Sequence, residues 1–150
     1  MANALYDKGR EAFLKGQINW IDDTIKVALV KIPSTGAAQS SDGSDYKVNI
    51  ATHQFLSSVP VNAVLATETL IRSDADGHAL NGIANAADLT FTNVTGKVGA
   101  LIIYKQSTNG ERSSSQLIAY LDTLNGLPYD KPNSDIKIQW DNGANKIFKL

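Results

Sequence analysis

The stretch VGALIIYKQ, residues 98–106, is followed after a short polar connection by QLIAYLDT, residues 116–123. Each contains a run of consecutive apolar or aromatic residues, at positions 100–104 and 117–121. Short runs that end in polar residues are typical of β-strands buried on both faces, because a helix needs greater length and a 3.6-residue period. The two stretches therefore predict a hairpin at the centre of a β-sandwich or barrel.

Alternation of apolar and polar residues predicts further strands on either side of this hairpin. Ile25, Val27 and Leu29 share one face of a strand that stops at Pro33, which cannot donate to a ladder. Further strands are expected at 61–72, 89–94, 136–140 and 146–150, with loops at 34–45 and 122–132. About eight short strands separated by turns are typical of a single mostly β domain, here residues 1–150 with an antiparallel sandwich or barrel.

Residues 3–16 are expected to form the one helix. Asn3 is a suitable N-terminal cap and Gly16 a suitable end, while the apolar residues between them recur at helical spacing. A helix of this length is marginal alone, so its apolar face must pack on the protein's own sheet or on a neighbouring subunit. The residues proposed for a subunit or capsid contact are Leu5, Tyr6, Ala12 and Phe13.

Composition narrows the function classes. The 150 residues are 43% hydrophobic and carry a net charge of −1, with the charges scattered singly. No run of Lys or Arg is available for phosphates or an anionic membrane, so direct nucleic-acid and membrane partners are not expected. The absence of cysteine excludes disulfides, thiolate metal sites and cysteine nucleophiles. Residues 1–13 contain no apolar segment of a secretory signal, and no stretch reaches the length of a membrane span.

The residues that could carry chemistry do not form a recognised pattern. Asp74 and Asp76 precede Gly77 as in the start of a calcium loop, but the later oxygen ligands of that loop are missing. His53 and His78 have no partner at metal-ligand spacing, and neither a nucleophile elbow nor a phosphate-binding glycine loop is present. The sequence predicts no catalytic residue, no metal site and no cofactor.

Several stretches together resemble a known family. The opening MANALYDKGREAFLKGQINWIDDTIKVALV, then ATHQFLSSVP, ALIIYK, LIAYLDT, GLP and the ending WDNGANKIFKL are similar to small virion structural proteins of tailed double-stranded DNA bacteriophages. The resemblance covers nearly the whole chain in the same order. Residues 34–45 look like an enlargement over family members, and the family supplies no catalytic residues.

The resemblance implies a non-enzymatic protein that is made in the host cytoplasm and assembled into the virion. A capsid decoration or cement protein on the head surface is the first expectation. Its partners would be the major capsid protein and itself, in a symmetric homo-oligomer for which a trimer would be usual. A tail or head–tail connector protein is the alternative. A carbohydrate-binding module at the virion surface is a third class, and would need Trp20 or Trp140 as an exposed platform.

Overall fold

The computed structural model describes residues 3–33, 45–71, 82–124, 127, 129–130, 133–140 and 147–150. Most of the predicted 34–45 loop and the whole Asp74–Gly77 turn lie outside the described residues. The same holds for His78 and for residues 141–143, whose sequence DNG predicts a tight turn.

The predicted hairpin is the centre of the main sheet. Strand β7, Ala100–Lys105, pairs antiparallel with β8, Gln116–Leu121. Every residue of β8 and all of β7 except Lys105 are buried, as the continuous apolar runs predict. The order of the five-stranded sheet is β1-β8-β7-β2-β3, where β1 is Ala4–Leu5, β2 is Ile25–Val30 and β3 is Val64–Thr69.

The side chains of this sheet enter two separate cores. Leu101 and Ile103 of β7 face the first core, whereas Ile102 and Tyr104 face the second. The pairing of β7 with β8 shifts register between Ile103 and Tyr104, so that Ile118 is an extra residue in β8. Such a bulge places two consecutive β8 residues on the same side of the sheet. Apolar burial on both faces is why these strands read as unbroken apolar runs.

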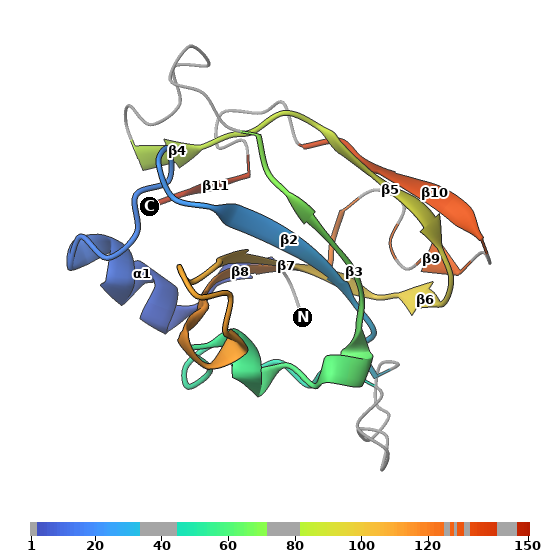
Figure 1. The fold of residues 1–150 in the computed structure, drawn as a ribbon, viewed down its shortest axis with the longest axis horizontal. Coiled ribbons are helices and arrows are strands. Elements are labelled where there is room, and N and C mark those ends of the chain that lie inside the picture. The colour runs from blue at the N-terminus through green and yellow to red at the C-terminus, as the bar shows by residue number, and fades with distance from the viewer. Residues whose placement is uncertain are drawn as a thin grey trace.

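Short strand pairs cover the first core. They are β5 (Leu89–Val94) with β10 (Ser134–Ile138), β4 (Ile83–Ala84) with β11 (Phe148–Lys149), and β6 (Lys97–Val98) with β9 (Tyr129–Asp130). Figure 1 shows the β5–β10 and β4–β11 pairs above the central sheet. The chain is therefore mostly β and antiparallel in a layered arrangement, as expected from its strand pattern.

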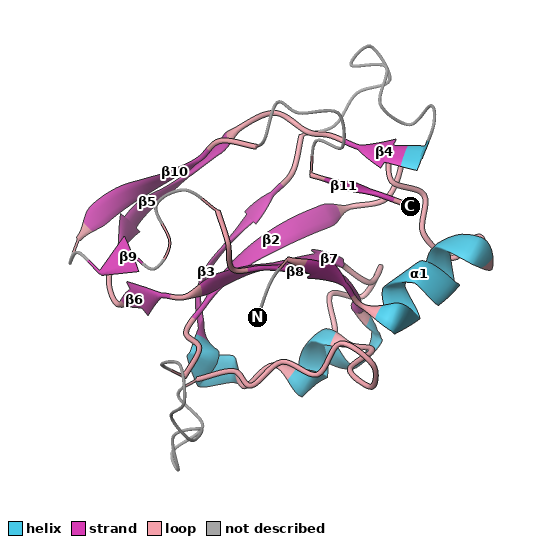
Figure 2. Cartoon of the chain, turned by 180° about the vertical axis from the view of Figure 1, so that it is seen from behind, coloured by secondary structure: helices cyan, strands magenta, loops and turns pink. Residues whose placement is uncertain are grey.

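Irregular structure covers the second core. Two 3-10 helices, Leu56–Ser58 and Val61–Ala63, lie under the sheet, and their position is clear in Figure 2. Arg112 holds the first of these helices, because its guanidinium donates to the carbonyl oxygens of Leu56 and Val59. The segment is thus held by hydrogen bonds from a side chain to its backbone carbonyls, and the two 3-10 helices are not part of a sheet.

The N-terminal helix is shorter than predicted. Helix α1 is Asp7–Leu14, and the residues before it form β1, which pairs with the edge of β8. Asn3 does not cap the helix: its side-chain oxygen accepts hydrogen bonds from the backbone amides of Asp122 and Thr123, at 2.9 and 3.0 Å. The open edge of β8 offers the first residues ladder bonds, which outweigh a further helical turn. The predicted end is right, since Gly16 has a φ of 71° and its amide donates to the Phe13 carbonyl.

The prediction of a loop at 122–132 is wrong in part, because Tyr129–Asp130 within it form strand β9.

Candidate interaction surface

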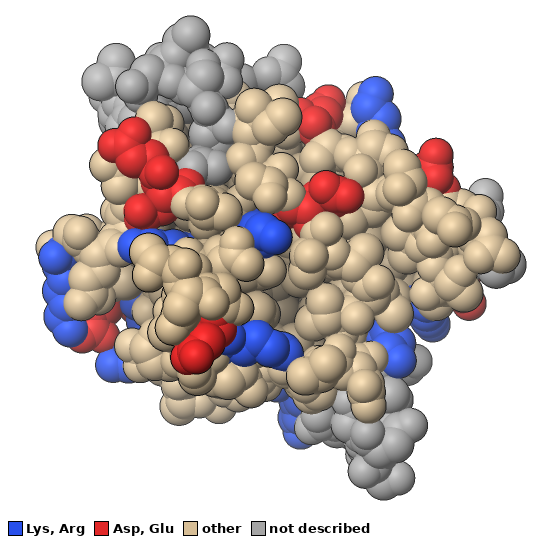
Figure 3. Space-filling model, in the orientation of Figure 1, with Lys and Arg blue, Asp and Glu red and all other residues tan. Residues whose placement is uncertain are grey.

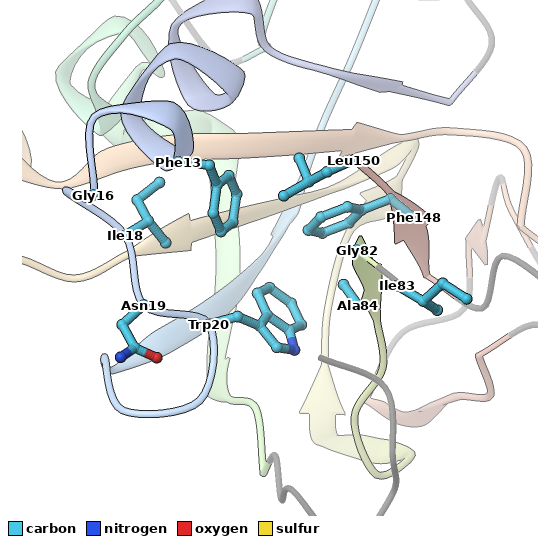
Figure 4. Close-up of a pocket in the computed structure, with 10 residues that line it drawn as sticks. All are labelled: Phe13, Gly16, Ile18, Asn19, Trp20, Gly82, Ile83, Ala84, Phe148 and Leu150. Carbon is cyan, nitrogen blue, oxygen red and sulfur yellow. The ribbon is translucent and has the colours of Figure 1, made fainter. Parts of the chain in front are cut away.

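A surface pocket opens between the end of α1, the turn that follows it, and the β4–β11 pair. Its volume is about 370 Å³. Figure 4 shows its ten lining residues, which come from three separate parts of the chain. We call it the apolar pocket, because its walls are mainly the side chains of Phe13, Ile18, Trp20, Ile83, Phe148 and Leu150.

Aromatic packing holds the walls in place. The ring of Phe148 packs edge-on against Trp20 at a centroid distance of 5.2 Å, and lies 6.2 Å from the ring of Phe13. The indole N–H of Trp20 donates to the Asn85 carbonyl at 3.1 Å. Contacts of this kind fix three rings from different elements, so the pocket is a preformed feature.

The polar atoms at the rim are engaged in local structure. The side-chain oxygen of Asn19 accepts from the amides of Ile21 and Asp22, and its amide group donates to the Asp22 carboxylate. The backbone amide of Leu150 donates to the Gly82 carbonyl at 2.8 Å. The pocket therefore presents mainly hydrocarbon, and the group that fits it is an apolar side chain or another apolar moiety.

One exposed leucine, Leu150, lines this pocket, and a second, Leu14, follows the lining residue Phe13 in the sequence. Leu14, the last residue of α1, is 90% exposed, and Leu150 is 55% exposed. Leu14 lies in the sequence between Phe13 and Gly16, both of which line the pocket. Exposed apolar side chains that cluster at an apolar depression mark an association site more often than isolated ones do.

The charges near the pocket form ion pairs on α1 and at the turn before β2. Along α1, the Glu11 carboxylate is paired with both Lys8 and Lys15, and their hydrogen bonds lower its pKa to about 2. In the turn before β2, Asp23 forms an ion pair with Lys105 at 3.0 Å, next to Asp22. Figure 3 shows basic atoms over α1 at the left edge of the molecule and acidic atoms above them, over this turn.

Three of the four residues proposed for a capsid or subunit contact are inside the protein. Leu5 and Ala12 belong to the first core, and Tyr6 is fully buried in the second. Only Phe13, which is half-buried and lines the apolar pocket, reaches a surface. A partner contact of α1 stays a prediction, and Leu14 rather than these buried residues is available for it. Little in the sequence indicates that Leu14 is exposed, because it directly follows two other apolar residues, Ala12 and Phe13.

The second core contains a chain of polar side chains. The hydroxyls of Tyr6 and Tyr46 are 2.9 Å apart, and the Tyr46 hydroxyl is 2.6 Å from Nδ1 of His53. The amide of Asn49 also donates to this Nδ1, at 3.3 Å. We therefore assign Nδ1 as an acceptor, with Tyr46 donating to it and Tyr6 donating to Tyr46.

Burial determines the ionisation of this chain. It raises the pKa of Tyr46 to about 12 and raises the pKa of Tyr6 further, where the neighbouring Tyr46 adds to the effect. Burial also lowers the pKa of His53 below its ordinary value of 6.5. Both phenols are therefore held protonated at neutral pH, and protonated phenols are poor nucleophiles.

Within the described part of the chain, no three His, Cys, Asp or Glu side chains come together as a possible metal site. Among the same residues, no helix is long and apolar enough to cross a membrane. Trp20 and Trp140 are both buried, and the indole N–H of Trp140 donates to the Ala87 carbonyl at 3.0 Å. Neither tryptophan is the exposed platform that a carbohydrate site would use.

Comparison with known proteins adds no assignment: neither a scan against protein-family models nor a search of curated proteins gives a match. What the fold and the surface define is a mostly β protein with a preformed apolar pocket at its surface, lined by residues near both ends of the described chain and by the β4 segment.

Proposed function

We propose that this protein is a non-enzymatic structural component of a tailed-bacteriophage virion, of the capsid decoration or cement type. The observation that carries the proposal is the apolar pocket with the exposed Leu150 at its rim, in a chain that covers both faces of its main sheet by itself. Such a protein offers an apolar surface for association in addition to the surfaces that its own fold already buries. The resemblance of both ends of the sequence to small phage virion proteins supplies the context.

A cement protein acts by binding the assembled head lattice in preference to its separated subunits. Whatever binds only the assembled state stabilises it by mass action, so each bound copy opposes the outward pressure of packaged DNA. The partners in this proposal are the major capsid protein and further copies of this chain. The place of action is the capsid surface, after synthesis in the host cytoplasm.

The test is the copy number in purified particles, measured by quantitative mass spectrometry against the major capsid protein. On the order of hundreds of copies is expected, because a cement protein repeats with the lattice. About six or twelve copies would refute the cement role and indicate the tail or the head–tail connector. Absence from the particles would refute the virion role altogether.

A second measurement tests the mechanism. Heads assembled without this protein should lose DNA at a lower temperature than complete heads, and adding the purified protein should restore the difference. Equal stability of the two kinds of head would contradict a cementing action even if the copy number is high.

A further inference from the structure

The turn at residues 49–53 is built around Asn49 and His53. The side-chain oxygen of Asn49 accepts from the amides of Ala51 and Thr52, at 3.2 and 3.1 Å. Its backbone carbonyl accepts from the His53 amide at 3.0 Å, and its own amide donates to Nδ1 of His53 at 3.3 Å. The imidazole is the one titratable side chain in this turn, so it alone makes the turn sensitive to pH near neutrality.

Two contacts join this turn to the junction between β1 and α1. The amide of Asp7, the first residue of α1, donates to the Ile50 carbonyl at 3.1 Å. The hydroxyl of Tyr6, the residue before it, is bonded to the Tyr46 hydroxyl, which is bonded in turn to Nδ1 of His53. Figure 1 shows the segment after residue 45, in teal, passing beneath the sheet and beside the start of α1. The start of the helix therefore rests on a turn that lies far along the chain.

Both bonds to Nδ1 of His53 require that this nitrogen carry no proton. Tyr46 and Asn49 both donate to it, whereas the imidazolium form has an N–H there in place of a lone pair. The Asn49 amide would then face another donor. The Tyr46 hydroxyl would have to donate to Tyr6, which leaves the buried Tyr6 hydroxyl without an acceptor among the described residues. A buried donor without an acceptor destabilises the arrangement that contains it.

The surroundings of His53 do not stabilise its charged form. The ring of Tyr46 packs against the imidazole at a centroid distance of 5.5 Å, and burial of the imidazole is the cause of its lowered pKa. Burial also raises the pKa of each phenol behind it, so these groups carry no charge at neutral pH. The ionisable groups on the elements that meet at this contact are Tyr46, Asp45 and Lys47 on its own segment, Tyr6 and Asp7 at the junction, and Tyr120 and Asp122 at the end of β8.

We propose that His53 is a pH-sensitive switch: when Nδ1 takes up a proton, the turn at 49–53 loosens, and the junction between β1 and α1 loses the two contacts that the turn supplies. At neutral pH the turn holds the Ile50 carbonyl at the Asp7 amide, and the Tyr46 hydroxyl at that of Tyr6. In acid both contacts weaken together, because both depend on the position of this one turn.

The opening is local, because the chain after the turn is held by bonds that do not involve a histidine. The Gln54 carbonyl accepts from the Leu117 amide at 2.9 Å, and the Leu56 amide donates to the Ser115 carbonyl at 2.9 Å. Arg112 donates to the carbonyls of Leu56 and Val59. The 3-10 helices therefore stay on the second core when the turn opens.

Amide hydrogen exchange, followed by NMR on the full chain, measures this opening. In the opened turn the imidazole is solvated and has its ordinary pKa of 6.5, so opening takes up a proton below that pH. The protection of the Asp7 and His53 amides, corrected for the intrinsic exchange rate, should therefore fall by up to about tenfold per pH unit from 6.5 down to the folded-state pKa. The protection of the Leu117 amide should not change over the same range.

Two variants separate His53 from other causes of pH dependence. His53→Gln keeps an acceptor for the Tyr46 hydroxyl but does not titrate, so the protection of the Asp7 amide should become independent of pH. His78→Gln removes the other histidine of the chain and should behave as the parent does. Circular dichroism at pH 7 should show the parent fold in both variants, which keeps the comparison free of unfolding.

Nitrogen-15 chemical shifts of the imidazole test the assignment of its proton. At neutral pH they should show His53 with Nδ1 unprotonated and Nε2 protonated, and its titration midpoint should lie below 6.5. Four results would overturn the inference. They are a proton on Nδ1 at neutral pH, protection of the Asp7 amide that does not change with pH, an equal fall at Leu117, or the same pH dependence in His53→Gln.

The switch and the virion role can fail separately. Protection that does not change with pH, in a protein present in hundreds of copies per head, would refute the switch and leave the proposed function standing. The expected loss of protection in a protein absent from particles would do the reverse.

Discussion

Replacing Gly9 by alanine should destabilise the protein, although alanine is the better helix former. Gly9 is buried in the first turn of α1, against the backbone of β8. A Cβ atom there would lie 2.8 Å from the carbonyl oxygen of Leu117 and 3.0 Å from that of Ile118. Ordinary contacts begin near 3.4 Å, and the atoms in the way belong to a central strand that cannot rotate aside as a side chain can.

Two opposing terms determine the size of the effect. Alanine in place of glycine favours a helix interior by about 1 kcal/mol. Overpacking against a rigid neighbour costs about 1–3 kcal/mol, and the backbone contacts of Gly9 place it at the upper end. The expected net change is a loss of about 1–2 kcal/mol in the free energy of unfolding, or a melting temperature lower by roughly 3–6 °C for a chain of this size.

Chemical and thermal unfolding followed by circular dichroism would measure this change. Arg10, on the exposed side of the same helix, supplies the controls. Arg10→Ala should change stability by less than about 0.5 kcal/mol, and Arg10→Gly should cost close to 1 kcal/mol, which measures the propensity term in this helix. A higher melting temperature in Gly9→Ala would contradict the close packing of α1 on the backbone of β8.

Three further predictions concern polar side chains that form hydrogen bonds within the protein. Burial lowers the pKa of His53 below 6.5, so the stability that this side chain contributes is complete above pH 6.5 and is lost as the pH falls through its folded-state pKa. Between pH 7 and 5, the denaturation midpoint of His53→Gln should therefore decline less steeply than that of the parent. An equal decline in the two proteins would contradict the lowered pKa of His53. The pKa of Tyr46 is raised from 10 to about 12 and that of Tyr6 is raised as well, so the stability that these phenols contribute is complete below pH 10 and is lost as the pH rises above it. Tyr46→Phe should lose less stability than the parent at alkaline pH. Unfolding at a series of pH values, with the ultraviolet absorbance of phenolate as the signal, would measure this difference. Asn3→Ala should lower the free energy of unfolding in urea by about 1 kcal/mol, because two backbone amides after β8 lose their acceptor. Asn3→Asp keeps an acceptor oxygen and should retain most of this stability. An unchanged free energy of unfolding in Asn3→Ala would refute the stabilising role of these two hydrogen bonds.

The strands could be predicted from the sequence wherever a local pattern reports burial. Continuous apolar runs identified β7 and β8 because both faces of those strands are covered, and alternation identified β5 and β10 because one face is. The helix was located but drawn too long, since its first residues have helical spacing and also fit the open edge of β8. Local pattern cannot choose between those two outcomes, because the choice depends on a strand more than a hundred residues away.

The apolar pocket could not be predicted from any single stretch. Phe13, Trp20 and Phe148 each read as ordinary core residues, and they form one wall only because the C-terminal strand β11 pairs with β4 beside the end of α1. The exposure of Leu14 is equally a tertiary property, since the helix could have rotated it inward had Gly9 not fixed which side meets β8.

The sequence by itself thus determined where the longer strands lie and that the central strands are covered on both faces, because hydrophobic periodicity is a local record of burial. It did not determine the two-residue strands β1 and β9, which lie in a predicted helix and a predicted loop. Only the tertiary structure decided which apolar side chains remain at the surface. That outcome depends on how helix α1, the turn after it and the last strand meet, and long-range packing of this kind leaves no periodic signal in the chain.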